Sequence, residues 1–147
     1  MQINSESTRR EIYYRQIADR ECASNANFMQ LLMAPRLMKI CEVAKTTIPE
    51  PIKNLEIKVF TVIGTKMEEF LLPQYIEEVI KLCEKYLSVL TIEELQSVAE
   101  LHKNSSPAQA KFNQAFAQGF NQKSKSAIRD KLEEAADAFC AKIKLEA

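Results

Sequence analysis

The fold class depends most on residues 52–71, which read IKNLEIKVFTVIGTKMEEFL. Leu55, Ile57 and Val59 alternate with charged residues, as they would in a half-buried strand. Over the whole stretch, however, apolar residues recur every three or four positions and so share one face of a helix. Because a single strand would find no partner run elsewhere in the chain, we predict a helix over 52–71. Gly64 inside this helix indicates either a close contact or a weak point.

Helical spacing of apolar residues continues through most of the remaining sequence. Pro35 lies inside one such stretch, so the helix there either kinks or divides in two. Pro73 is predicted near the start of another helix, and residues 122–126 are predicted to be the weak joint within the last helical stretch. The chain is therefore predicted to be all-α, a bundle of about five to seven helices without a sheet.

The clearest interruption is at residues 46–51, where Pro49 and Pro51 favour extended backbone in the residues before them. A length of 147 residues suits one domain. We predict a single all-helical domain over 1–147, with a candidate break at 46–51 between an N-terminal helical hairpin and a C-terminal bundle.

Two short motifs mark predicted helix starts. Thr91 and Glu94 have the spacing of a capping box, in which each side chain accepts a hydrogen bond from the other residue's backbone N–H. Ser106, Pro107 and Gln109 place a hydroxyl, a proline and an amide where the first turn of a helix favours them. We interpret these residues as structural caps with no catalytic part.

Composition excludes several classes of function. The 20 basic and 20 acidic residues balance, whereas a general nucleic-acid-binding protein normally carries a net positive charge. Two glycines are too few for a phosphate-binding loop, and one histidine excludes a site that needs two imidazoles. No run approaches the roughly 18 consecutive apolar residues of a membrane span. We expect no nucleic acid, no membrane span, no cofactor and no metal.

The four cysteines form no closely spaced pair; they are Cys22, Cys41, Cys83 and Cys140. A zinc site would therefore need ligands from distant helices. An even number of cysteines permits two disulfides in an oxidising compartment. The favoured interpretation is that each cysteine is a small, buried apolar residue. In a helical hairpin that turns near Asn25, Cys22 and Cys41 lie too far apart for a disulfide, so we predict that they are not bonded to each other.

His102 is the single histidine, and it lies near the end of a predicted helix, where the helix dipole favours a cation. The alternative is a hydrolase-like enzyme that uses His102 as a general base with a glutamate. No nucleophile motif accompanies it, and adjacent glutamates such as Glu77 and Glu78 point about 100° apart on a helix. The sequence therefore favours a protein that is not an enzyme.

The most distinctive surface pattern is an aromatic ridge, formed by Phe112, Phe116 and Phe120 beside Ala115 and Gly119. Phenylalanines at spacing four form one slowly winding stripe, and the small residues beside them let another helix or an apolar ligand approach closely. Ordinary core packing is the alternative interpretation. We predict that Phe116 is mostly buried, by helix 52–71, by a second copy of the chain or by a bound hydrophobic molecule.

Residues 70–120 also carry an ordered set of motifs, namely Leu72-Pro73-Gln74-Tyr75, Leu90-Thr91-Ile92-Glu93-Glu94-Leu95, Ser106-Pro107 and Lys111. In this order they resemble a bacterial family, the domain of unknown function twenty-fifty-nine. The chain departs from the family's pattern at Leu101-His102, where the family has an aromatic pair, and at Gln109, where it has glycine. The resemblance implies an all-helical fold, a signal peptide absent from this sequence, and a periplasmic or secreted location. It implies no reaction.

Together these observations predict a non-enzymatic helical protein of the bacterial envelope, periplasmic or secreted, with a cytoplasmic location as the alternative. It is expected to bind a partner protein or an apolar small molecule through the aromatic ridge. A purely structural homo-oligomer, such as a homodimer, and the enzyme that uses His102 are the other hypotheses.

Overall fold

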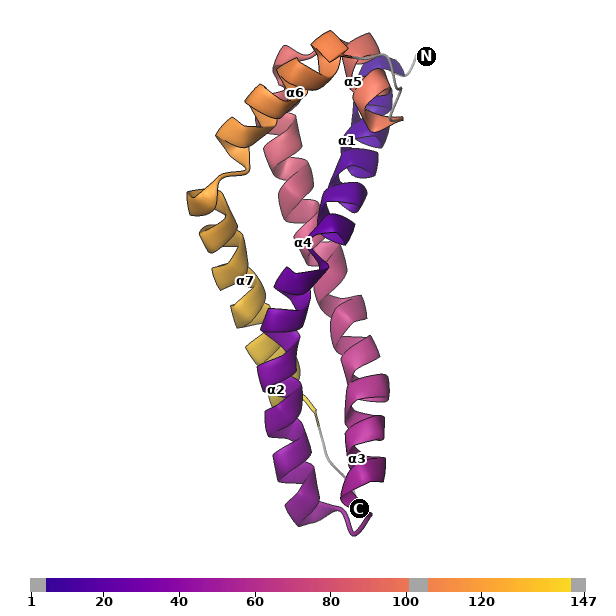
Figure 1. Cartoon of the computed structure of the whole chain (residues 1–147), viewed down its shortest axis with the longest axis vertical. Helices are drawn as coiled ribbons and strands as arrows, with labels where there is room; N and C mark the ends of the chain where they lie inside the picture. The colour runs from indigo at the N-terminus through magenta and orange to yellow at the C-terminus, as the bar shows by residue number, and fades with distance from the viewer. Residues whose placement is uncertain (1–4, 101–105, 144–147) are drawn as a thin grey trace. The chain divides into compact units, whose positions relative to one another are not determined.

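The computed structural model describes residues 5–100 and 106–143, and every regular element within these two ranges is a helix (Figure 1). The predicted all-α fold is therefore confirmed. The α-helices are α1 (Ser5–Ser24), α2 (Ala26–Thr47), α3 (Ile52–Lys58), α4 (Gly64–Tyr86), α5 (Ile92–Ala99), α6 (Ser106–Gly119) and α7 (Gln122–Ala141). A π-helical segment, η1 (Val59–Ile63), joins α3 to α4, and a 3-10 turn, η2 (Leu87–Val89), follows α4.

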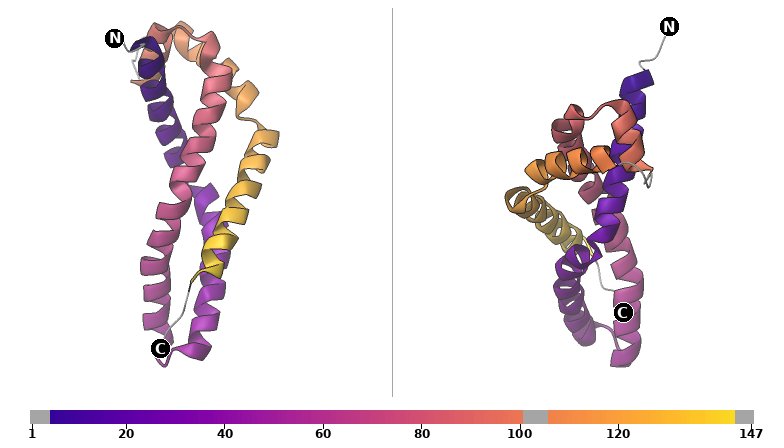
Figure 2. Two further views of the ribbon diagram at one scale, coloured as in Figure 1. Left: turned by 180° about the vertical axis from the view of Figure 1, so that it is seen from behind. Right: turned by 45° about the horizontal axis from the view of Figure 1, so that its top comes forward.

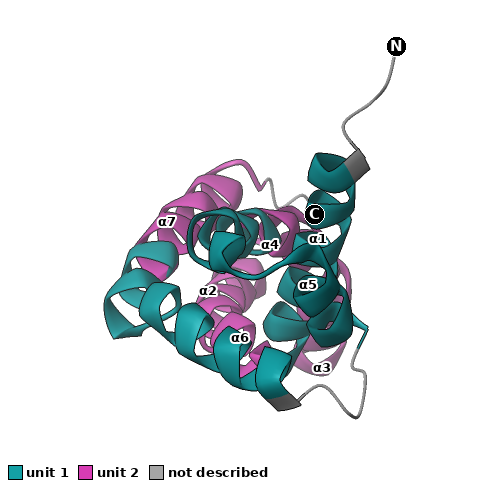
Figure 3. Ribbon diagram, turned by 90° about the horizontal axis from the view of Figure 1, so that it is seen from above, with its two compact units in different colours: residues 1–24, 75–128 teal, residues 25–74, 129–147 magenta. Residues whose placement is uncertain are grey.

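The chain divides into two compact units, drawn teal and magenta in Figure 3. Unit 1 comprises residues 1–24 and 75–128, and unit 2 comprises residues 25–74 and 129–147. The predicted break at 46–51 falls inside unit 2, at the turn that joins α2 to α3. The turn lies where two prolines interrupt helical hydrogen bonding.

In unit 1, α1 lies against α5, and two arginines of α1 bind the ends of α5. Arg10 Nη2 donates to Leu90 O at 2.7 Å, just before α5 begins. Arg20 donates to Val98 O at 3.1 Å and to Ala99 O at 3.2 Å, at the end of α5. Because the last carbonyls of a helix lack a donor four residues further on, the Arg20 guanidinium satisfies them and complements the negative end of the helix dipole.

The predicted capping box at the start of α5 is confirmed. Thr91 Oγ1 accepts a hydrogen bond from Glu94 N at 3.2 Å, and Glu94 Oε1 accepts one from Thr91 N at 2.7 Å. Lys111 Nζ of α6 lies 2.9 Å from the same Glu94 oxygen. The cap of α5 therefore also connects α5 to α6.

The break between α6 and α7 lies at residues 120–121, so the predicted joint at 122–126 is wrong. Asn121 Oδ1 accepts from Ser124 N at 3.0 Å, and Ser124 Oγ accepts from Asn121 N at 2.9 Å. This reciprocal pair caps the first turn of α7 in the manner of a capping box. The polar residues after Asn121 therefore begin a helix rather than interrupt one.

In unit 2, α2 and α3 form a hairpin, which Figure 2 shows from two further sides. Gly64 makes the predicted close contact, because a Cβ there would lie 3.3 Å from Leu37 Cδ1 of α2. The π-helical segment Val59–Ile63 ends directly before Gly64. Helical hydrogen bonding thus changes its pattern beside the glycine that the sequence marked as a contact or a weak point.

Two prolines lie inside helices, Pro35 in α2 and Pro73 in α4. The prediction that Pro73 lies near a helix start is wrong, and α2 runs through Pro35 without dividing. After each proline, the next side chain donates to the backbone carbonyl four residues before itself. Arg36 Nη1 donates to Leu32 O at 2.8 Å, and Gln74 Nε2 donates to Phe70 O at 3.0 Å. The carbonyls that these side chains bind directly follow those that the two prolines leave without a backbone donor.

Candidate functional site

The aromatic ridge lies in the core of unit 1. Phe112 and Phe116 are buried and stack with their ring centroids 5.1 Å apart, which confirms the prediction that Phe116 is buried. Phe120 is half-buried, with its ring centroid 5.2 Å from that of Phe116. Ala115 and Gly119 are buried as well. The structure therefore brings the five predicted site residues together.

The partners of the ridge are the neighbouring elements of its own unit. Within unit 1, α6 packs against α5 and η2, whereas the expected partner, helix 52–71, belongs to unit 2. Gly119 lies so close to Tyr86 that a Cβ would come within 2.7 Å of Tyr86 Cγ. The aromatic ridge is therefore packed as a core is, which agrees with the alternative interpretation of its phenylalanine spacing as ordinary core packing.

His102, the proposed base of the alternative enzyme, lies outside the described residues. In the part of the chain that the structure describes, no three His, Cys, Asp or Glu side chains gather closely enough to hold a metal ion. The same part contains no helix with the length and apolar character needed to cross a membrane.

All four cysteines are free thiols, so Cys22 and Cys41 are not bonded to each other, as predicted. Cys22, Cys41 and Cys83 are buried, whereas Cys140 is half-buried. Burial raises the pKa of the Cys22 and Cys83 thiols to about 12, because a thiolate is poorly solvated there and nearby carboxylates oppose a second negative charge. The buried cysteines therefore serve as small apolar core residues.

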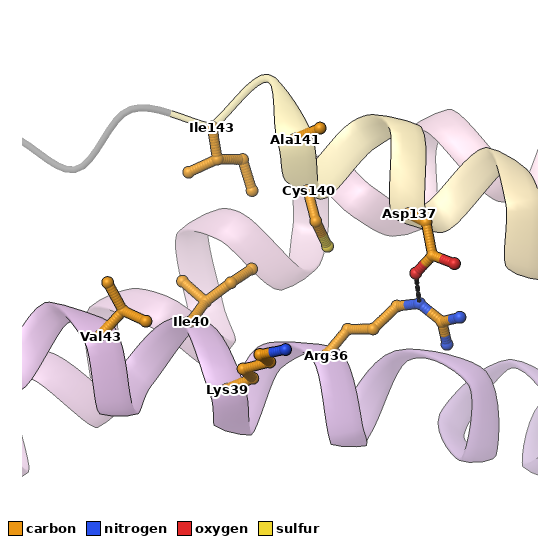
Figure 4. A pocket seen from close by; sticks show the side chains of 8 residues that line it. All are labelled: Arg36, Lys39, Ile40, Val43, Asp137, Cys140, Ala141 and Ile143. Atoms are coloured by element: carbon orange, nitrogen blue, oxygen red, sulfur yellow. Dashed lines mark hydrogen bonds and ion pairs between the residues drawn. The ribbon is translucent and has the colours of Figure 1, made fainter.

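A pocket of about 370 Å³ opens in unit 2 between α2 and the end of α7 (Figure 4). Its size is at the lower end of the range for small-molecule sites, about 300–1,000 Å³. No residue of the aromatic ridge lines it. The lining residues are Arg36, Lys39, Ile40, Val43, Asp137, Cys140, Ala141 and Ile143.

The pocket changes from polar to apolar along its length, as Figure 4 shows. At one end, Arg36 Nε donates to Asp137 Oδ1 at 2.9 Å. At the other end, Val43 of α2 and Ile143, which follows α7, present aliphatic side chains. Such a gradient suits a ligand that is polar at one end only.

Arg36 and Lys39, the two cations among the described lining residues, have different surroundings. Arg36 is held in place, because it donates to Leu32 O at 2.8 Å and to Glu133 O at 3.5 Å in addition to its ion pair with Asp137. Lys39 is exposed and makes no hydrogen bond or ion pair with any described residue. The Lys39 ammonium is therefore the positive charge that an incoming ligand can engage.

Cys140 contributes a sulfur atom to the pocket, directed from α7 toward α2 (Figure 4). Burial raises the pKa of the Cys140 thiol, although the nearby Arg36 guanidinium acts in the opposite direction. The thiol is therefore less acidic than an ordinary cysteine, whereas the surroundings of reactive cysteines lower the pKa of the thiol. This property favours binding over nucleophilic catalysis at the pocket.

The outer face of α2 carries uncovered apolar side chains beside the pocket. Leu31 is 78% exposed and Met38 is 57% exposed. Together with Ala34 and Pro35 they line a shallow hollow that Lys39 also borders. Exposed apolar residues that gather on one helix face are typical of a surface that contacts another molecule.

Sequence reasoning missed the pocket because its charged residues have the spacing of an ordinary solvated helix face. The available signal was that Arg36, Lys39 and Val43 share one side of a helix with the apolar Ile40. That signal does not show which helix lies opposite, and Asp137 is 101 residues away from Arg36 in the sequence.

No protein-family model, no curated protein and no solved structure matches this chain. The resemblance to the domain of unknown function twenty-fifty-nine is accordingly neither supported nor contradicted, and it stays a prediction.

Proposed function

We propose that this protein is a non-enzymatic helical binding protein of the bacterial envelope, and that it binds an apolar small molecule in the pocket between α2 and α7. The observation that carries the proposal is the pocket itself, about 370 Å³ in volume and lined by Ile40, Val43, Ala141 and Ile143 among a few polar groups. Small-molecule sites typically combine an apolar lining with a small number of polar side chains. The family resemblance supports the periplasmic or secreted location.

We place the binding surface in the pocket rather than on the aromatic ridge. Phe112 is 6% exposed and Phe116 is 8% exposed, so little of either ring is accessible to a ligand. Val43, by contrast, is 48% exposed and offers apolar surface that a ligand would cover. Covering such surface stabilises the complex by about 25 cal/mol per Å². The entropic cost of ordering the ligand offsets part of this gain.

Titration with the neutral dye N-phenyl-1-naphthylamine tests this proposal. We expect a saturable rise in dye fluorescence with one dye molecule per chain. Val43→Asp should weaken dye binding roughly fivefold or more, because it places a carboxylate at the apolar end of the pocket. Val89→Asp is the matched control, since Val89 is 60% exposed and does not line the pocket. Equal dye binding by the two variants would contradict the proposal.

The location is tested separately by fractionation of cells that express the chromosomal gene with a C-terminal tag. The protein is expected in the periplasmic fraction or in the culture medium. Recovery with the cytoplasmic fraction would leave the binding proposal standing and overturn the envelope location.

A second candidate function is that of a structural homodimer formed through the outer face of α2. Leu31 and Met38 are more than half exposed and lie two helical turns apart, which favours contact with a second copy. Light scattering should then give twice the 16.8 kDa mass of the chain, and Leu31→Glu should return the monomer. A monomeric parent protein would exclude this candidate.

A further inference from the structure

We propose that the ligand of the pocket is a single-chain amphiphile with a carboxylate head, of the medium-chain fatty acid class. This inference rests on the proposed function and adds the charge and the orientation of the ligand. The carboxylate is bound by Lys39, and the alkyl chain lies along Ile40, Val43 and Ile143.

The charges of the pocket favour an anion. Among the described residues that line the pocket, Arg36 and Lys39 outnumber Asp137, the one acidic side chain. Arg36 is already paired with Asp137, so Lys39 is the cation open to a ligand. A carboxylate beside the Lys39 ammonium gains charge-assisted hydrogen bonds, whereas an ammonium head would meet a like charge.

Lys39 also borders the outer hollow of α2, together with Glu42. It forms no ion pair with Glu42, so its ammonium is free to turn toward the pocket. A long, flexible side chain of this kind places its charge at the rim while its methylenes lie on apolar surface.

The gradient along the pocket sets the orientation of the ligand. The ion pair between Arg36 and Asp137 marks the polar end, and Val43 and Ile143 mark the apolar end. A carboxylate beside Val43 would lose part of its hydration without gaining a partner. The head therefore lies beside Lys39 and the chain extends toward Ile143.

The size of the pocket limits the alkyl chain. A volume of about 370 Å³ suits one short or medium chain rather than the two long chains of a phospholipid. Each methylene that the pocket covers should raise the affinity about fourfold. We expect the affinity to rise from hexanoate to decanoate and then to level off once the pocket is filled.

Calorimetric titration of the full chain tests the inference with decanoate, 1-decanol and decyltrimethylammonium, all below their micellar concentrations. The three probes share one alkyl chain and differ only in the head. Decanoate should bind roughly fivefold more tightly than decanol, because the ion pair with Lys39 is exposed to solvent, and the ammonium should bind more weakly than either. Raising the salt concentration should weaken the binding of decanoate but not that of decanol.

Variants of Lys39 isolate the contribution of the ammonium. Lys39→Gln should abolish the preference for decanoate over decanol, and Lys39→Arg should keep it. Lys45→Gln is the matched control, because Lys45 is also exposed on α2 but does not line the pocket. The preference for decanoate should survive in that variant.

Cys140 reports whether the ligand lies in this pocket. It is half-buried while the other three cysteines are buried, so it should react first with a maleimide. Bound decanoate should slow this reaction, and Cys140→Ser should remove the fast-reacting thiol.

The outcomes separate the two proposals. If decanol binds as tightly as decanoate, or if Lys39→Gln keeps the preference, the carboxylate inference is overturned while apolar binding stands. If decanoate binds without protecting Cys140, the inference is overturned because the ligand lies elsewhere. If neither the dye nor any of the three amphiphiles binds, the proposed function itself fails.

Discussion

Gly119 lies directly against the aromatic ring of Tyr86, so that a Cβ at position 119 would come within 2.7 Å of Tyr86 Cγ. The glycine therefore allows the end of α6 to approach the residues just before η2. The contact explains why a small residue accompanies the aromatic ridge. It makes room for the ring of Tyr86 rather than for a ligand.

Gly119→Ala should therefore destabilise the protein by about 1–3 kcal/mol, because the added methyl group overpacks the contact with Tyr86. Gly64→Ala is the matched control. A Cβ at Gly64 would meet the flexible end of Leu37 at 3.3 Å, and alanine gains about 1 kcal/mol of helix propensity over glycine. Urea unfolding should show a clear loss for the first variant and little change for the second. Similar losses in both would contradict this account.

Phe116→Ala should cost about 3–5 kcal/mol of stability, because it leaves a cavity in the core of unit 1. The folded variant, at low temperature, should keep its affinity for the naphthylamine dye and for decanoate. Thermal melting and dye titration on the same sample measure both properties. An unchanged melting temperature together with lost ligand binding would show that the aromatic ridge is the binding site after all.

Arg20→Met should destabilise the protein by about 1.5–3 kcal/mol, because it leaves the carbonyls of Val98 and Ala99 without their charged donor. Arg15→Met on the same helix is the control, since its ion pair with Asp19 is exposed to solvent and contributes about 0–1 kcal/mol. Chemical denaturation should show a larger loss of unfolding free energy for Arg20→Met than for Arg15→Met. If the Arg15 variant lost as much stability as the Arg20 variant, the capping role of Arg20 would be wrong.

Glu94 should make the stability of the protein depend on pH in the acid range. The hydrogen bond from Thr91 N and the nearby Lys111 ammonium lower the pKa of Glu94 below its ordinary value of 4.5. A carboxylate whose pKa is lower in the folded state stabilises that state above the ordinary value, and this stabilisation is lost as the pH falls through the lowered pKa.

The measurement is urea unfolding of the parent protein and of Glu94→Gln at a series of pH values. The difference in unfolding free energy between them should be constant at neutral pH and should shrink below pH 4.5. A difference that increased on acidification would contradict the assignment.

The sequence predicts structure well where the interacting residues are close along the chain. Thr91 and Glu94 are three residues apart, and the capping box they predict is present. Asn121 and Ser124 form an equivalent pair that was not predicted, because the polar residues around Ser124 resemble a loop. The three-residue spacing of Asn121 and Ser124 is that of a helix cap, but the polar composition of residues 122–126 favoured a loop.

The prolines show the limit of local reasoning. Pro73 disrupts a helical turn, yet α4 continues through it. On either side of it, Met67, Leu71 and Val79 are fully buried. Packing of these side chains contributes more free energy than the lost backbone bond costs, and such packing is a property of the folded chain.

By itself, the sequence determined that the chain is helical and where several helices begin, because helix formation depends on residues within one or two turns of each other. Only the tertiary structure decided that Phe116 faces a core and that Lys39 borders a pocket. Those outcomes depend on which helices meet, and Arg36 and Asp137 lie 101 residues apart in the chain that brings them within 2.9 Å. The burial of a side chain is set by its neighbours in space, which the spacing of residues along one helix does not specify.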